Sequence, residues 1–201
     1  MKITVASFKG GVGKTTTAVH IATYLSKLAP TILVDGDPNR SATGWAKRGE
    51  LPFPIIDEKN TKRAGEFAHT VIDTEANPND EDLVFLARNC DLLVLPTTPD
   101  ALALDALGRT IERLRNIGKN NHVVLLTVVP PRPNRDGEEA RLLLKQLKIL
   151  TFNTEIARLV AYTKASREGV PVYAVEDRRA SIAWDDYVKL GKEILKRGKE
   201  K

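Results

Sequence analysis

Residues 8–16, FKGGVGKTT, join a predicted strand to a predicted helix near the start of the chain. Residues 2–7, KITVAS, are a short β-branched run, and residues 15–28 carry apolar side chains at helical spacing. Gly10, Gly11 and Gly13 therefore lie in a strand-to-helix turn. Because glycine lacks a Cβ atom, such a turn can point several backbone N–H groups at one anion. The stretch predicts a phosphate-binding loop.

A lysine and a hydroxyl complete this loop. Lys14 is placed to reach the β- and γ-phosphates of a nucleoside triphosphate, and the Thr15 hydroxyl to ligate Mg²⁺ at the positive end of the following helix. A glycine-rich turn with a solvated lysine is the alternative, but the lysine, the hydroxyl and the flanking pattern all coincide. A dinucleotide-binding turn would need a third small residue at position 16, where Thr16 stands.

The loop departs from the general P-loop pattern at its first position. In G-x-x-x-x-G-K-[ST] the first glycine would be residue 8, which is Phe8, and Lys9 follows it. This deviant Walker A form resembles the ParA/MinD family of ATPases, in which two subunits enclose two ATP molecules. The resemblance implies an ATP-dependent homodimer in which Lys14 acts within its own subunit and Lys9 reaches the phosphates held by the other. A solvated loop lysine is the alternative for Lys9. The implied ATP contacts in this loop are Lys9, Gly10, Gly11, Val12, Gly13, Lys14, Thr15 and Thr16.

Acidic residues follow two buried strands. Residues 31–35 end in Asp35, and Asp37 comes two positions later in DGDPNRSA; residues 69–73 end in Asp73. Ligands of parallel α/β sheets bind at the carboxyl ends of the strands, so these side chains should lie near the phosphates. The first segment is similar to the family's switch I, which implies that Asp37 is catalytic and positions the attacking water. An Asp-Pro turn with Ser41 capping a helix over 42–47 is compatible with that role.

The segment ending in Asp73 resembles Walker B. The resemblance implies that Thr15, Asp37 and Asp73 form the Mg²⁺ site. Glu75 stands where the family more often has an apolar residue or proline, and its role stays open.

Strands and helices alternate along the rest of the chain. The pattern predicts an edge strand over 53–57 between prolines, and helices over 59–68, 81–89, 101–117, 141–147, 157–167 and 182–195. Further strands are predicted over 91–95, 122–128 and 150–152. This alternation indicates an α/β fold with a mostly parallel twisted sheet and helices on both faces. We expect one P-loop ATPase domain over residues 1–201, with no additional N-terminal DNA-binding segment.

The resemblance extends to the C-terminal part of the chain. Residues 156–172, IARLVAYTKASREGVPV, are similar to the C-terminal pattern of ParA proteins, so the likeness covers nearly the full length. In relatives the adenine ring lies between the loop after the last long strand and a loop near the C-terminus. This implies an adenine pocket formed by Pro131 and residues 169–173.

Lysine and arginine are concentrated in the last third of the chain. Residues 141–201 hold 14 Lys and Arg against 8 Asp and Glu, whereas residues 1–140 hold 17 against 18. This asymmetry indicates a surface for a polyanion, and well-solvated helices are the alternative interpretation. Given the resemblance, the expected polyanion is non-specific nucleoid DNA. The candidate contacts are Lys145, Lys148, Arg158, Lys164, Arg167, Arg178, Arg179, Lys189, Lys192, Lys196 and Arg197.

Composition excludes several other classes of protein. Cys90 is the only cysteine, so the chain can form no internal disulfide and cannot supply the ligands of an iron–sulfur cluster, as a reductase of this fold would require. His20, His69 and His122 are scattered among apolar residues and favour core or surface roles over metal binding. No apolar run approaches the ~20 residues of a membrane span. The expected location is the cytoplasm, on the nucleoid.

Two switch functions remain after these exclusions, beside a metabolic enzyme of the same fold such as a ligase, which would need sites for substrate carboxylates. The first is a short ParA-type switch that binds DNA as an ATP-bound dimer and whose hydrolysis is stimulated by an adaptor protein linking it to a cargo, such as a plasmid or a carboxysome. The alternative is a MinD-like membrane-associated positioning ATPase, which needs an amphipathic C-terminal helix with a free apolar face. The basic tail after residue 195 has no large apolar residue, which argues against membrane binding.

Overall fold

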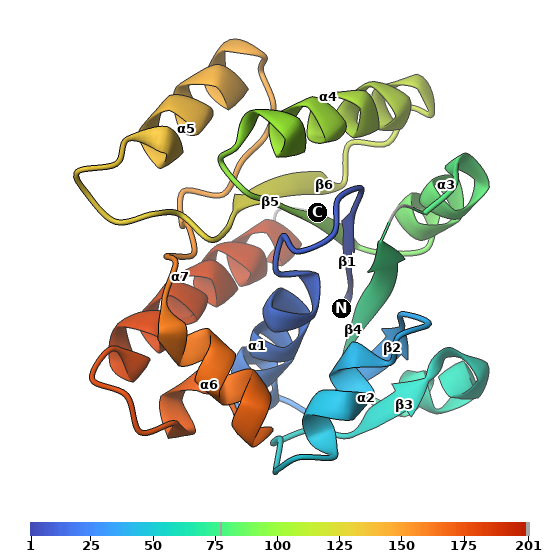
Figure 1. The fold of residues 1–201 in the computed structure, drawn as a ribbon. Helices are drawn as coiled ribbons and strands as arrows, with labels where there is room; N and C mark the ends of the chain where they lie inside the picture. The colour runs from blue at the N-terminus through green and yellow to red at the C-terminus, as the bar shows by residue number, and fades with distance from the viewer. Residues whose placement is uncertain (77, 200–201) are drawn as a thin grey trace.

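A six-stranded sheet forms the centre of the computed structural model, which describes residues 1–76 and 78–199 (Figure 1). Its strands lie in the order β3-β2-β4-β1-β5-β6, and every pairing is parallel. The predicted sheet is confirmed and is parallel throughout, with β3 at one edge. The strands are β1 (Lys2–Ser7), β2 (Thr31–Gly36), β3 (Ile55–Asp57), β4 (His69–Ala76), β5 (Leu92–Thr97) and β6 (His122–Leu126).

Helices cover both faces of this sheet, as predicted. Alternate strand residues point to opposite layers, so Leu92 and Val94 join one hydrophobic core while Leu93 and Leu95 join the other. One face carries α1 (Lys14–Ser26), α2 (Ser41–Ala46), α6 (Val160–Glu168) and α7 (Ala180–Lys199). The other carries α3 (Asp80–Arg88), α4 (Ala101–Asn116) and α5 (Asp136–Gln146).

The helices predicted over 59–68 and 141–147 differ from the observed ones. The exposed helix predicted over 59–68 is a 3₁₀ helix, η1 (Glu58–Glu66), with a kink at Asn60. Helix α5 begins at Asp136 rather than at 141, because the Asn134 side chain accepts a hydrogen bond from the Asp136 N–H and three acidic residues favour the first turn.

The prediction of a strand over 150–152 is wrong. Only isolated bridges, Val124 with Thr151 and Val129 with Ala157, join this segment to β6 and the residues after it. The backbone N–H groups of residues 153 and 154 instead donate to the Glu193 carboxylate on α7, so they are not available to a ladder. The backbone of residue 157 is engaged in its β-bridge with Val129, so α6 starts at Val160 rather than at 157.

The last helix packs closely on the first. At Gly191 of α7 an added Cβ would lie 2.2 Å from the Tyr24 ring, and at Gly198 it would lie 2.0 Å from Met1 Cε. The Thr17 and Tyr187 hydroxyls lie 3.3 Å apart in the same contact. Residues 200 and 201 of the basic tail lie outside the described residues. Within the described chain, no helix has both the length and the apolar character needed to cross a bilayer.

Candidate active site

The glycine-rich loop leads from β1 directly into α1. Gly11 and Gly13 have φ angles of 79° and 80°, the left-handed conformation that side chains disfavour and glycine adopts freely. Helix α1 starts at Lys14, and no side chain caps its first turn. The free N–H groups of that turn and the positive end of the helix dipole provide the geometry that an anion needs.

Three predicted site residues lie together at the start of α1. Lys14 is only 8% exposed, and Thr15 Oγ1 donates a hydrogen bond to Asp73 Oδ2 at 2.7 Å. Burial raises the pKa of Asp73 to about 7, against the opposing effects of the Thr15 hydrogen bond and the Lys14 charge. The second carboxylate oxygen, Oδ1, is buried and has no hydrogen-bond partner among the described residues.

This arrangement fits the magnesium ion that the resemblance implies. Mg²⁺ prefers oxygen ligands and keeps several waters, so a hydrated ion beside Thr15 would satisfy the free oxygen of Asp73. The described residues contain no group of three or more His, Cys, Asp and Glu that could hold a metal alone. The ion would therefore depend on phosphate oxygens and water for the rest of its shell. The Glu75 carboxylate makes no hydrogen bond or ion pair in the described part of the chain.

The two carboxylates after β2 have different partners. Asp35 is fully buried, and its Oδ2 accepts hydrogen bonds from the Thr43 N–H at 2.8 Å and the Thr43 hydroxyl at 2.6 Å. It therefore caps α2, a role that the sequence had given to Ser41. Asp37 is 7% exposed, and its Oδ1 accepts hydrogen bonds from the backbone and the side chain of Asn39. The negative charges of Asp35 and Asp37 both contribute to the raised pKa of Asp73. Asp35 is engaged in capping α2, whereas Asp37 is not.

Lys9 lies at the exposed end of the loop. Its Nζ donates to Asp100 Oδ1 at 2.7 Å, and the two side chains are 36% and 49% exposed. This bond and a second one from the Thr98 hydroxyl lower the pKa of Asp100 to about 2. Asp100 also accepts a hydrogen bond from the Ala103 N–H and caps α4. The ion pair thus ties the loop to the start of that helix.

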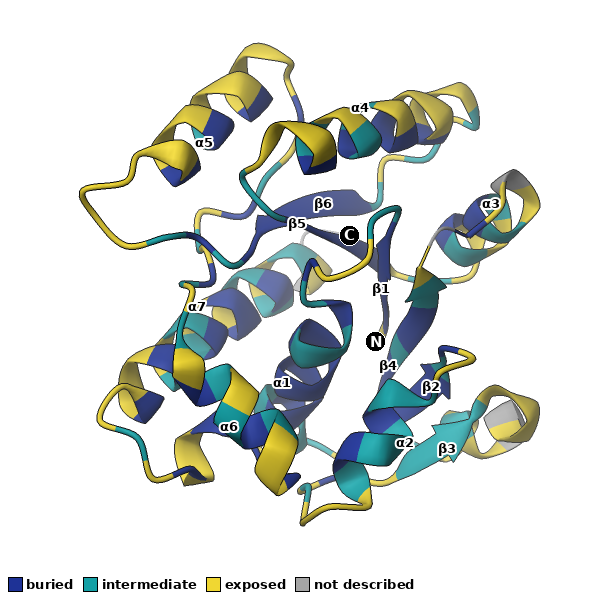
Figure 2. Cartoon of the chain, viewed as in Figure 1, coloured by how far each residue is buried: buried dark blue, intermediate teal, exposed yellow. Residues whose placement is uncertain are grey.

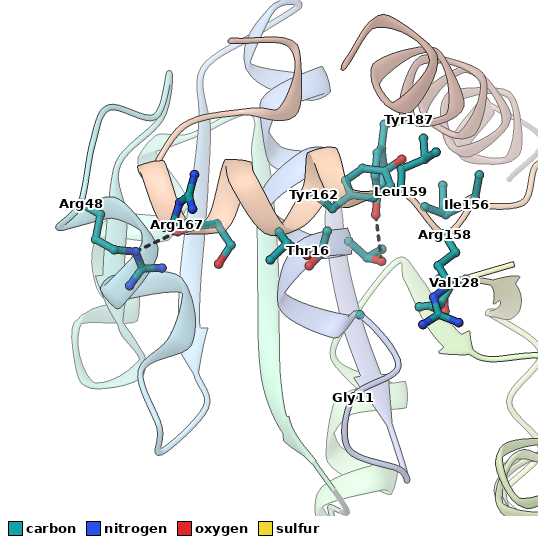
Figure 3. A pocket seen from close by; sticks show the side chains of 16 residues that line it. Gly11, Thr16, Arg48, Val128, Ile156, Arg158, Leu159, Tyr162, Arg167 and Tyr187 are labelled. Carbon is teal, nitrogen blue, oxygen red and sulfur yellow. Dashed lines mark hydrogen bonds between the residues drawn. The ribbon is translucent and has the colours of Figure 1, made fainter. Parts of the chain in front are cut away.

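A cavity of about 680 Å³ opens beside the loop (Figure 3). Thr16 and Thr17 of α1 form one side of it, while Val128, residues 156–159 and α6 form the other. Val128 has a φ of 54°, which a β-branched residue rarely adopts. The preceding Thr127 hydroxyl donates to the Val12 carbonyl at 2.8 Å, so the segment after β6 is tied to the phosphate loop. The cavity can hold the nucleoside of a nucleotide bound at that loop.

The predicted adenine contacts do not line this cavity. Pro131 is exposed, because the chain turns outward after Val129 pairs with residues 156–158. Residues 169–173 lie behind the wall, where the Val172 N–H donates to His20 Nε2 at 3.1 Å. The wall instead includes three arginines and no carboxylate: Arg48, Arg158 and Arg167.

His20 is a core residue at the centre of an aromatic cluster. Burial lowers its pKa to about 4, and its Nδ1 lies 2.7 Å from the Thr16 carbonyl oxygen. Its ring stacks on Tyr187 at 4.7 Å and meets the edges of Trp45 and Tyr162. The cluster joins α1 to α2, α6 and α7. The sequence predicted a core or surface role for His20. It did not predict the contacts with these aromatic rings, because the residues that carry them are far from His20 along the chain.

Comparisons with known proteins agree with this geometry. Residues 3–172 match the model of the CobQ/CobB/MinD/ParA nucleotide binding domain. The chain is 34% identical to maintenance of carboxysome distribution protein A of Gloeobacter kilaueensis, over 96% of this chain and 93% of that protein. It is 28% identical to protein ParA of Rhizobium radiobacter, over 90% of this chain and 89% of that protein. The septum site-determining protein MinD of Pyrococcus horikoshii, solved with Mg-ADP, has a similar fold at a TM-score of 0.68 and 17% identity, covering 96% and 95% of the two chains. This chain therefore belongs to the ParA/MinD family of nucleotide-binding ATPases.

Proposed function

We propose that this chain is an ATP-driven switch that positions a cargo over the nucleoid. ATP with Mg²⁺ closes a homodimer, the dimer binds DNA non-specifically, and hydrolysis stimulated by an adaptor protein releases it. The observation that carries the proposal is the cluster of buried Lys14 and Asp73 with half-buried Thr15, next to a Lys9 that stays at the surface. The similarity to a carboxysome-distribution protein and to ParA supports a carboxysome or a plasmid as the cargo.

Each residue has a distinct part in this cycle. The loop N–H groups and Lys14 bind the β- and γ-phosphates, and Thr15 with Asp73 holds the hydrated Mg²⁺, which neutralises charge on the phosphate oxygens. Asp37 orients the attacking water. Lys9 leaves Asp100 and contacts the phosphates bound to the partner subunit, so hydrolysis depends on dimerisation.

The DNA surface is proposed on the face of the sheet that carries α6 and α7. Arg158, Arg178 and Arg179 are exposed there and have no ion pair within the described residues, whereas Lys164 pairs with Asp177 at 2.9 Å. Unpaired cations are the groups that can neutralise DNA phosphates and release counterions. Of the earlier candidates, Lys145 and Lys148 belong to α5 or follow it on the other face of the sheet, so they do not share this surface.

Binding to random-sequence DNA tests the proposal. It should require ATP, be absent with ADP or without nucleotide, and weaken steeply as salt rises. Reversing Arg178 and Arg179 to Glu should weaken DNA binding without changing ATP affinity. The matched control reverses Lys145 and Lys148, which should leave DNA binding unchanged. Equal DNA binding in all nucleotide states would contradict the switch.

The last helix, α7, does not offer the free apolar face that the membrane alternative requires. Tyr187, Leu190 and Ile194 form the apolar side of α7 and are at most 1% exposed, because they pack into the core. An amphipathic membrane helix needs that side to be available to lipid. This burial supports DNA rather than a membrane as the tethering surface.

A further inference from the structure

Arg40 ends the loop that carries Asp37, and its backbone is strained. The loop runs from Gly36, the last residue of β2, to α2, which begins at Ser41. Arg40 has a φ of 51° and a ψ of 42°, the left-handed conformation that residues other than glycine, asparagine and aspartate rarely adopt. Its N–H donates to the Asp37 carbonyl at 2.8 Å, and its carbonyl accepts from the Gly44 N–H at 2.7 Å. Such strain persists where surrounding contacts fix the residue, and it is concentrated at functional sites.

The Arg40 side chain makes contacts that fix it in this conformation. One Nη atom of its guanidinium donates to the carbonyl of Asp35, at the other end of the loop. The second Nη atom pairs with Asp57 Oδ2 at 3.1 Å and with Glu58 Oε1 at 3.3 Å. Asp57 ends β3 and Glu58 begins η1. One side chain therefore joins the two ends of the Asp37 loop and ties both of them to the edge of the sheet.

The start of the same loop is closely enclosed. An added Cβ at Gly36 would lie 3.1 Å from the Asp73 carbonyl oxygen and 3.4 Å from Glu58 Oε2. Gly36 thus lies between the strand that carries Asp73 and the carboxylate that binds Arg40. Figure 2 shows β3 in teal, because none of its three residues is fully buried, beside the dark blue strands at the centre of the sheet. At this lightly buried edge, the bonds of Arg40 provide a specific attachment for the loop.

We infer that Arg40 is a positioning residue for ATP hydrolysis, which holds the Asp37 loop so that the Asp37 carboxylate orients the attacking water. The inference rests on the proposed function, in which Asp37 has that role. The Arg40 guanidinium is engaged with three oxygens of its own chain, so it acts through Asp37 and not on the phosphates. A planar guanidinium can bind these oxygens together in a fixed geometry, which a lysine ammonium cannot do. ATP binding should not depend on Arg40, because the loop N–H groups and Lys14 supply it.

Steady-state ATP hydrolysis by Arg40→Asn tests this inference. Asparagine tolerates the left-handed backbone but cannot reach the oxygens that arginine binds. We expect kcat to fall about tenfold with the KM for ATP unchanged, because a small displacement of a water-orienting group slows the reaction without weakening substrate binding. Sedimentation with ATP should still show the dimer.

Arg141 of α5 offers a matched control. Its side chain is 35% exposed, against 33% for Arg40, and it likewise donates to a backbone carbonyl, that of Phe152, and to a glutamate, Glu155. It contributes no residue to the nucleotide cavity. Arg141→Asn should therefore lower the urea midpoint about as much as Arg40→Asn does, and leave kcat unchanged.

Two further variants separate positioning from a purely structural role. Arg40→Gly leaves room for a free guanidinium ion, and glycine adopts the left-handed conformation without strain. Millimolar guanidinium chloride should restore part of its turnover and should not stimulate the wild type. Adding Arg40→Asn to Asp37→Ala should slow hydrolysis no further than Asp37→Ala alone, because both changes act through one carboxylate.

Several results would overturn the inference. They are a normal kcat in Arg40→Asn, a raised KM for ATP with normal kcat, a glycine variant that guanidinium does not restore, and additive losses in the double variant. Normal turnover in Asp37→Ala would instead contradict the proposed role of Asp37. The failure of the inference and the failure of the proposed function can therefore be told apart.

Discussion

The two lysines of the phosphate loop lie five positions apart and have opposite surroundings. Lys14 is 8% exposed at the start of α1, next to the Thr15–Asp73 hydrogen bond. Lys9 is 36% exposed, and among the described residues its side chain is held by an ion pair with Asp100, itself 49% exposed. The side chain of a buried lysine is confined to one position. An exposed ion pair contributes little free energy to stability, so its lysine can exchange one partner for another. In the proposed cycle, the buried end of the loop serves its own chain and the exposed end serves a second subunit.

Removing the Lys14 charge is the strongest test of this contrast. Lys14→Ala should lower ATP affinity by more than about 100-fold, because it removes charge-assisted bonds to two phosphates in a desolvated position. Lys9→Ala is the matched control and should leave the ATP affinity of the monomer unchanged. Isothermal titration calorimetry at low protein concentration measures both. Equal losses in the two variants would show that the ends of the loop do not differ in role.

Substituting Asp37 tests whether ATP binding and ATP hydrolysis depend on different side chains. Asp37→Ala should lower the turnover number about 100-fold, as expected when the group that orients the water is lost, and should preserve ATP affinity and dimerisation. Phosphate release under single-turnover conditions reports the chemistry, and sedimentation reports the dimer. Asp35→Ala should instead destabilise the fold, because it removes the cap of α2. Normal turnover in the Asp37 variant would exclude Asp37 from catalysis.

Asp73, at the buried end of the loop, should make the stability of the folded chain depend on pH. Its pKa is about 7 in the folded chain and 3.8 as the unperturbed value, so between these limits the folded state binds the proton and the unfolded state does not. Stability without Mg²⁺ should therefore fall as pH rises from about 4 to about 7, by about 1 to 3 kcal/mol relative to Asp73→Asn. Mg²⁺ needs the carboxylate, so its affinity should rise over the same range.

Urea unfolding of the wild type and of Asp73→Asn at a series of pH values measures that difference. His20 acts in the opposite direction, because its folded pKa of about 4 makes stability rise with pH up to 6.5, and the comparison between the two proteins cancels its contribution. A pH-independent difference would show that the carboxylate is charged in the folded chain throughout.

The smallest effect is expected at the exposed end of the loop. Asp100→Asn removes the ion pair with Lys9 but keeps a residue that caps α4. The free energy of unfolding should change by less than about 1 kcal/mol at pH 7, whereas ATP-dependent dimerisation should strengthen a few-fold because Lys9 is released. Thr98→Ala serves as a control that leaves the ion pair in place. Weaker dimerisation in the asparagine variant would show that Asp100 helps Lys9 rather than restraining it.

Sequence reasoning located the parts of the site that depend on local pattern. The glycines, Lys14 and the acidic strand end at Asp73 follow from spacing within a strand and the turn after it, and the structure brings them together. The sheet and its two helical layers follow from the alternation of apolar segments in the same way.

The parts that depend on distant contacts were not predictable. Val128 lines the cavity because of its unusual backbone conformation, and Arg48 enters the wall from the turn after α2 because its Nε donates to the Ser166 carbonyl. Neither fact leaves a pattern in the sequence. Pro131 was placed in the pocket by resemblance, and the pairing of Val129 with residues 156–158 carries it to the surface instead.

The close packing of α7 on α1 has a consequence for how the chain folds during synthesis. The phosphate loop is translated before β4 and β5, the two strands that pair with β1 on either side. The helix that follows the loop is then buried by Tyr187 and Gly191, which are translated long after it. Contacts between segments so distant in the chain form slowly. A nascent chain should therefore acquire nucleotide affinity only once α7 has been translated, so a ribosome stalled before that helix should carry a chain that cannot yet respond to ATP.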